Sequence, residues 1–139
     1  MKIAVITNDA LKEELLAQGS QEAALIEWLA EPKSVEDADC YIDLLFQPDA
    51  ERISKLQNAI IIVNSVIATL NNLPQSFIRI NGWPTFLKRN IVEASCNNDD
   101  MKIRAEKCFV AFNKNAEWVA DLPGFISTRV ISMIINEAY

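Results

Sequence analysis

Hydrophobic residues in this chain fall into short unbroken runs separated by mixed polar segments, which is the pattern of an α/β domain. The clearest run covers residues 59–63, where an alanine, three isoleucines and a valine suit a strand covered on both faces of a parallel sheet. Similar but shorter runs predict further strands, bounded by Gly, Pro or Asn. The strands are expected at residues 2–6, 23–29, 39–46, 59–63, 76–80, 90–95 and 116–120.

Helical segments are predicted between these runs from their capping residues and apolar spacing. Asn8 or Asp9 can cap a helix that reaches about residue 18 and ends at Gly19. Further helices are expected from Pro48 to about residue 56, over residues 99–112, and from Gly124 onward, where the sequence is strongly apolar. This alternation predicts a Rossmann-like, mostly parallel twisted sheet with flanking helices and a C-terminal apolar helix, in one domain spanning residues 1–139.

Composition narrows the classes of partner. The 139 residues are 50% hydrophobic, which is enough for one buried core. A formal charge of -6 argues against a nucleic acid or an anionic membrane as partner, because both would repel the chain at long range. No apolar run approaches the roughly 18 residues of a membrane span, and we expect a cytoplasmic protein.

The inventory of reactive side chains is restricted. Histidine is absent, which removes the commonest general base, the commonest metal ligand and every histidine-dependent nucleophile. Cys40, Cys96 and Cys108 are odd in number and widely spaced, so reduced buried thiols are expected, with Cys40 and Cys96 in strands. No metal site is expected.

Five short motifs occur in a consistent order, at residues 38–43, 62–65, 77–81, 91–93 and 122–129. They read Ala-Asp-Cys-Tyr-Ile-Asp, Ile-Val-Asn-Ser, Phe-Ile-Arg-Ile-Asn, Ile-Val-Glu and Leu-Pro-Gly-Phe-Ile-Ser-Thr-Arg. Together they resemble motifs of the 3-hydroxyacyl-CoA dehydrogenase family. The last motif, continued to residue 138, is similar to the hinge where these enzymes leave their nucleotide-binding domain.

The resemblance implies that the chain corresponds to that nucleotide-binding domain alone, with residues 122–139 as hinge and terminal helix. The helical domain that helps to close over the acyl-CoA would then be missing. In the family the terminal segment packs into that domain, so we expect the apolar residues 125–139 to fold back or to form a homodimer.

The resemblance also implies where a nicotinamide dinucleotide would lie. The family places its pyrophosphate against a Gly-X-Gly-X-X-Gly turn, whereas residues 7–12 here are Thr7-Asn8-Asp9-Ala10-Leu11-Lys12. Asp9 puts a carboxylate beside that phosphate, and such a pair repels by roughly 1–4 kcal/mol near a protein surface. Lys12 would offset part of this repulsion. Asp9 is more simply a helix cap or a first-turn charge.

Glu27 falls where the family's ribose-binding acid would lie, at the end of the second predicted strand. It can equally be a strand-end carboxylate. NAD is therefore a possible cofactor through the resemblance alone.

Catalytic positions implied by the resemblance carry different side chains here. The family's histidine, which takes the proton of the 3-hydroxyl, is replaced by Asn81, whose amide cannot act as a base near neutral pH. Glu93 matches the glutamate that orients this histidine. Asn64, in the motif at residues 62–65, also remains as a polar candidate. The hinge asparagine is replaced by Thr128, and the substrate-holding serine by Val66. A turn at Asn81 and a strand-edge charge at Glu93 are the simpler interpretations.

These residues predict a degenerate homologue of the dehydrogenase nucleotide-binding domain that lacks dehydrogenase activity and acts as a binding or interaction module. The alternative is an NAD-dependent 3-hydroxyacyl-CoA dehydrogenase component that retains cofactor binding and obtains its second domain from another chain. In a third possibility, the cleft at the carboxyl ends of the strands binds another small molecule, such as an acyl-CoA fragment, with Trp83 near its mouth.

Overall fold

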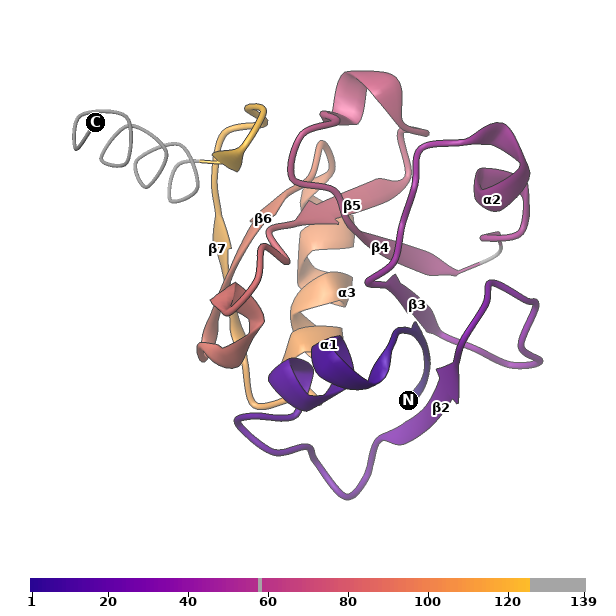
Figure 1. The fold of residues 1–139 in the computed structure, drawn as a ribbon, viewed down its shortest axis with the longest axis vertical. Helices are drawn as coiled ribbons and strands as arrows, with labels where there is room; N and C mark the ends of the chain where they lie inside the picture. The colour runs from indigo at the N-terminus through magenta and orange to yellow at the C-terminus, as the bar shows by residue number, and fades with distance from the viewer. Residues whose placement is uncertain (58, 126–139) are drawn as a thin grey trace.

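A computed structural model describes residues 1–57 and 59–125 of the chain (Figure 1). Seven strands form one sheet in the order β2-β1-β3-β4-β5-β6-β7. All neighbouring strands are parallel except β5 and β6, so the prediction of a mostly parallel, Rossmann-like sheet is confirmed. The strands are β1 (Lys2–Ile6), β2 (Leu25–Leu29), β3 (Cys40–Asp43), β4 (Ile60–Asn64), β5 (Phe77–Ile80), β6 (Ile91–Ser95) and β7 (Asn115–Trp118).

Three helices and two short 3-10 turns connect the strands, and each α-helix begins at a polar cap. The side chains of Asn8, Asp49 and Asn98 accept a hydrogen bond from the backbone N–H three residues later, which satisfies one of the open donors at the helix start. The elements are α1 (Asp9–Leu15), α2 (Ala50–Ser54), α3 (Asp99–Val110) and the 3-10 turns η1 (Leu70–Asn72) and η2 (Phe86–Lys88).

The sheet is buried on both faces, as its apolar strands predict. Alternate residues such as Ile42 and Ile62 pack under α1 and α3, with Phe109 and Phe112 completing that layer. The intervening residues, such as Ile61, pack on the opposite face against the short α2 and the loops around it. The longest helix within residues 1–57 and 59–125 is α3, which lies across the centre of the sheet (Figure 1).

Several predicted boundaries were wrong. Helix α1 ends at Leu15, and the following turn closes at Gly19, which has a φ of 81° that only glycine adopts easily. Strand β3 stops at Asp43 rather than at residue 46. Cys96 lies beyond the end of β6 and is half-exposed, whereas Cys40 and Cys108 are buried as expected.

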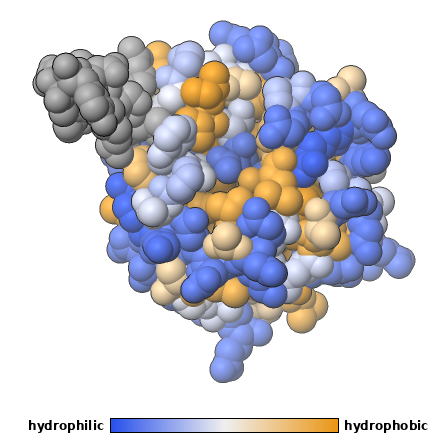
Figure 2. Space-filling model, in the orientation of Figure 1, coloured by the Kyte–Doolittle hydropathy of each residue, from blue (hydrophilic) through white to orange (hydrophobic). Residues whose placement is uncertain are grey.

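Figure 2 shows one face, where hydrophilic residues predominate around a hydrophobic band in the middle. Of the helices in the described part of the chain, none combines the length and apolar character needed to cross a bilayer. The expected terminal helix lies beyond residue 125 and therefore outside the described residues, and the homodimer expected through it stays a prediction.

Candidate functional site at the carboxyl ends of the strands

The turn from β1 to α1 forms a small pocket, and four of the predicted cofactor-site residues line it. Thr7, Asn8, Asp9 and Lys12 surround a hollow of about 180 Å³ together with the end of β2 at residues 28–30. The Oδ1 atom of Asn8 accepts a hydrogen bond from the N–H of Leu11 at 2.9 Å, so this side chain occupies the open end of the helix. The structure therefore brings these four residues together.

Trp28 is a lining residue that the sequence analysis missed. The ammonium group of Lys12 lies 4.5 Å from the centre of the Trp28 ring, within the range of a cation–π contact. The ring in turn packs edge-on against Phe112, with centroids 6.4 Å apart. Lys12 is thus held against the end of β2. The signal in the sequence was an aromatic residue next to the end of the second predicted strand.

Glu27 does not join this group at the strand end. It lies in the middle of β2 and pairs in register with Ala4, and β2 continues for two more residues to Leu29. The residues that line the pocket at this end are Trp28, Leu29 and Ala30. A carboxylate is therefore absent from the lining at the end of β2.

A second group of predicted residues meets where β4, β5 and β6 lie side by side. Asn81 follows β5 directly, and its Nδ2 atom donates a hydrogen bond to Oε1 of Glu93 in β6 at 3.0 Å. Both side chains are buried, and the backbone N–H of Asn81 also donates to the carbonyl of Glu93. Asn81 and Glu93, which the resemblance aligned with the family's histidine and glutamate, are therefore in direct contact.

Asn64 reaches this group from the end of β4. Its Oδ1 atom accepts from the N–H of Gly82 at 2.9 Å, and its Nδ2 atom donates to the carbonyl of Leu44 at 3.2 Å. A Cβ at position 82 would lie only 2.5 Å from Cγ of Asn64, so the close approach requires glycine there. Asn64 thus fixes the turn that follows Asn81. Thr128, the fourth candidate, lies outside the described residues.

A buried arginine, Arg79, lies next to this group, and the sequence indicated it only as a member of the motif at residues 77–81. Arg79 belongs to β5 and its side chain is fully buried. Its guanidinium donates hydrogen bonds to the backbone carbonyls of Ser65 and Val66, at 2.9 and 2.8 Å. It also pairs with Asp121 and lies 4.2 Å from the centre of the Phe125 ring. Burial lowers the pKa of Arg79, while the hydrogen bond to Asp121 acts in the opposite direction. Arg79 therefore joins the loop after β4 to the segment after β7.

A second buried ion pair was not predicted. Asp43, fully buried at the end of β3, accepts two hydrogen bonds of 2.7 Å from Nε and Nη2 of Arg52 in α2. The hydrogen bond from Arg52 to Asp43 raises the pKa of the arginine. This bidentate pair docks α2 on the sheet.

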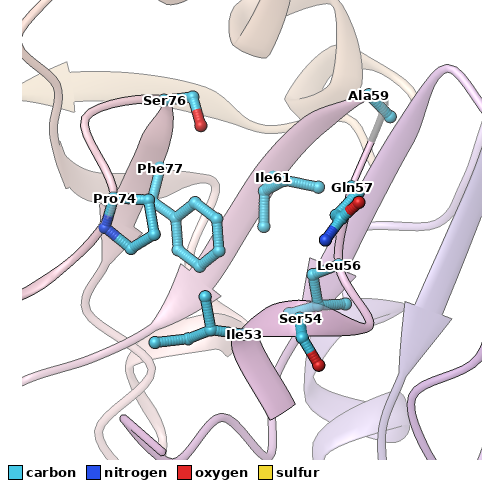
Figure 3. A pocket seen from close by; sticks show the side chains of 9 residues that line it. All are labelled: Ile53, Ser54, Leu56, Gln57, Ala59, Ile61, Pro74, Ser76 and Phe77. Atoms are coloured by element: carbon cyan, nitrogen blue, oxygen red, sulfur yellow. The ribbon is translucent and has the colours of Figure 1, made fainter. Parts of the chain in front are cut away.

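A further pocket lies at the opposite ends of the strands. A pocket of about 370 Å³ lies at the amino ends of β4 and β5, and Figure 3 shows Ile53, Pro74 and Phe77 around it. In open α/β sheets, ligands bind at the carboxyl ends of the strands, so the position of this pocket differs from that of a nucleotide site. Within residues 1–57 and 59–125, no group of three or more acidic, cysteine or histidine side chains could hold a metal ion.

Comparison with known proteins identifies the fold. No family model matches the sequence, and no curated protein matches it either. The structure is similar to that of a 3-hydroxyacyl-CoA dehydrogenase from Archaeoglobus fulgidus, with a TM-score of 0.65 and 14% identity over 99% of this chain and 62% of that chain.

Two further crystal structures show the same likeness. The (S)-3-hydroxybutyryl-CoA dehydrogenase of Ralstonia eutropha has a TM-score of 0.70 and 14% identity, covering 99% of this chain and 69% of that chain. For the 3-hydroxyisobutyrate dehydrogenase of Salmonella typhimurium the TM-score is 0.56 at 12% identity, with coverage of 97% and 61%. The chain therefore spans about two thirds of the length of these enzymes. It has the Rossmann-like fold found in 3-hydroxyacyl-CoA dehydrogenases.

Proposed function

We propose that this chain is a degenerate homologue of the 3-hydroxyacyl-CoA dehydrogenase nucleotide-binding domain, without dehydrogenase activity, and that it acts as a binding or interaction module. The observation that carries the proposal is the buried pair of Asn81 and Glu93. A proton must leave the 3-hydroxyl as the hydride leaves the carbon, and an amide cannot take it near neutral pH. The chain has no histidine that could replace Asn81.

The β1–α1 pocket supports the same conclusion because it does not fit a dinucleotide. The N–H of Leu11 already donates a hydrogen bond to the side chain of Asn8, so it is not open to a phosphate. Asp9 adds a negative charge where a pyrophosphate would approach. Lys12, the cation that could offset this charge, lies against Trp28 instead.

The alternative function is an NAD-dependent dehydrogenase component that works with a separate partner domain. It is favoured by one observation, namely that Thr7, Asn8, Asp9 and Lys12 still line a hollow at the position where Rossmann domains bind a pyrophosphate. On this alternative, the turn would widen when the cofactor binds, and Lys12 would leave Trp28 to meet a phosphate.

Calorimetric titration with NADH separates the two functions. The interaction module should give no saturable heat up to about 1 mM NADH, whereas a retained cofactor site should saturate in the micromolar range. Acetoacetyl-CoA reduction by the purified chain with NADH is the second measurement. Either micromolar binding or turnover would overturn the proposal.

The variant Asn81→His tests whether the missing imidazole is the only defect. This change places an imidazole beside Glu93, with Asn81→Gln as the matched control that keeps an amide. Because the β1–α1 turn also fits a dinucleotide poorly, we expect neither variant to reduce acetoacetyl-CoA. Activity in Asn81→His alone would show that the cofactor site is intact and would support the alternative.

The oligomeric state and the location are further parts of the proposal. We expect a homodimer that uses the apolar residues 125–139, and a cytoplasmic location. Light scattering after size exclusion should give twice the mass of the chain, and a monomer at all concentrations would contradict the dimer.

A further inference from the structure

Strand β2 forms one edge of the sheet and offers an open row of backbone groups. It pairs with β1 only, and no other segment of residues 1–57 and 59–125 pairs with it. The N–H of Leu25 donates to Met1, and the carbonyl of Leu29 accepts from Thr7. Since the direction of these groups alternates along a strand, the backbone groups of Ile26 and Trp28 point away from β1.

The side chains of β2 make this edge an unusual one. Exposed edge strands are commonly protected by charged residues or proline, because an apolar edge recruits other strands. Here four of the five residues are apolar, and Leu25 is 66% exposed. Glu27, at the centre of the strand, is the only charged residue in it.

The charge around β2 selects the partner. Residues 21–40 hold six carboxylates and one lysine, so they carry a net charge of -5 out of the -6 of the whole chain. Glu22 and Glu31, both exposed, flank the two ends of the strand, and Glu27 lies between them. A strand that pairs here must therefore be cationic to be attracted rather than repelled.

A second copy of this chain does not meet that requirement. If two β2 strands paired antiparallel through Ile26 and Trp28, Glu27 would lie directly opposite Glu27 of the other copy. Like charges at directly opposed positions destabilise a strand pair, and the flanking acidic segments would add to the repulsion. The edge thus disfavours pairing with itself.

We propose that the outer edge of β2 is a docking site for an extended basic peptide, which adds a strand to the sheet. The peptide carries Lys or Arg opposite Glu27 and apolar residues opposite Ile26 and Trp28. This inference deepens the proposed interaction role by naming the class of partner. Its outcome is separate from that of the NADH titration, which reports on the β1–α1 pocket.

Amide hydrogen exchange followed by NMR tests the site with a defined probe. The probe is the capped peptide Lys-Val-Val-Lys-Val-Val-Lys, whose central lysine meets Glu27 when the strands are centred. Saturating peptide should slow exchange of the Ile26 and Trp28 amides by about tenfold or more, because these become hydrogen-bonded. The Leu25 and Glu27 amides already face β1 and should change little.

Two matched peptides separate strand addition from general attraction between charges. In Lys-Val-Pro-Lys-Pro-Val-Lys the charge is unchanged, but the two prolines remove the N–H groups that would pair with β2. The third peptide carries Glu at the three Lys positions. We expect neither peptide to protect Ile26 or Trp28. Equal protection by the proline peptide, or no protection by the lysine peptide at about 1 mM, would overturn the proposal.

Charge reversal in the protein provides the remaining test. Glu27→Lys should weaken binding of the lysine peptide by about tenfold and favour the glutamate peptide. Glu117→Lys in β7, the strand at the other edge of the sheet, makes the same change in net charge and should leave binding unaffected. Equal weakening by both variants would contradict a site on β2. Protection that grows with protein concentration in the absence of peptide would show self-pairing and would also overturn the proposal.

Discussion

Arg79 and Asp121 form an ion pair of 2.6 Å between Nη1 and Oδ1, and it links β5 to the segment that follows β7. Asp121 also accepts hydrogen bonds from the N–H of Leu70, at the start of η1. Two loops that are distant in the sequence are thus held on one buried cation.

Removal of this carboxylate should be costly. Asp121→Ala leaves the fully buried guanidinium of Arg79 without its counter-charge, and we expect a loss of about 3 kcal/mol in the free energy of unfolding. Because Asp121 is itself 23% exposed, the value lies at the lower end for buried pairs. Urea denaturation measures it. Glu51→Ala, which removes an 82% exposed partner of Lys55, is the control and should cost less than about 1 kcal/mol.

The pair of Asp43 and Arg52 should depend on its bidentate geometry. Arg52→Ala leaves a fully buried carboxylate unpaired and should cost about 3 kcal/mol of unfolding free energy. Arg52→Lys keeps the charge but loses one of two parallel hydrogen bonds, so about half of that loss is expected. Lys55→Ala, in the residue that caps the same helix, is the control. A lysine variant as stable as the wild type would contradict a bidentate requirement.

The stability of the protein should fall at alkaline pH through Cys40. Burial, followed by a hydrogen bond with Cys108, raises the pKa of the Cys40 thiol well above its ordinary value of 9.0. The unfolded chain therefore releases this proton near pH 9 while the folded protein keeps it. Stability from this group is complete below pH 9 and is lost as pH rises toward the folded pKa, with a slope of up to about 1.4 kcal/mol per pH unit.

Thermal unfolding of the wild type and of Cys40→Ala between pH 8 and 10 measures this slope. The variant should be less stable at pH 8 because it leaves a small cavity, but its stability should fall less steeply above pH 9. Cys96→Ala, at the half-exposed cysteine, is the matched control. Parallel curves for wild type and Cys40→Ala would show that Cys40 does not carry the effect.

A methyl group at position 82 should disrupt the turn beside Asn81. The Cβ introduced by Gly82→Ala would lie 2.5 Å from Cγ of Asn64, and we expect a loss of about 1–3 kcal/mol in unfolding free energy. If the clash with Asn64 is the cause, the double variant with Asn64→Ala should lose less than the sum of the two single variants. Strictly additive losses would point to a different cause.

The fold class could be predicted from local sequence patterns. Continuous apolar runs indicate strands that are buried on both faces. Polar caps such as Asn8 and Asn98 indicate where helices begin. Both signals can be recognised in the sequence because they depend only on residues that are close together along the chain. The boundaries of β1 and the presence of seven strands along the chain were predicted correctly, whereas their order in the sheet was not predicted. Helix α1 was predicted too long because Gly19 was taken to end the helix, whereas Gly19 closes a turn that follows Leu15.

Part of the candidate site was also determined by the sequence. The absence of histidine and the lack of glycine in residues 7–12 are properties of composition and needed no coordinates. Asn64, Asn81 and Glu93 were named as candidates through the resemblance of their motifs to the dehydrogenase family. The structure brings these three residues together where β4, β5 and β6 lie side by side.

Which charged side chains are buried, and which groups they contact, depends on how distant segments pack together. Arg79, Asp43 and Lys114 look like surface residues in the sequence, yet each is buried. The partners of Arg79 and Lys114 come from segments far away in the chain, and the partner of Asp43 comes from the next helix. Glu27 was expected at a strand end, but the register of β2 with β1 places it mid-strand on an open edge. Strand register and long-range ion pairs arise from packing, which local sequence patterns do not specify.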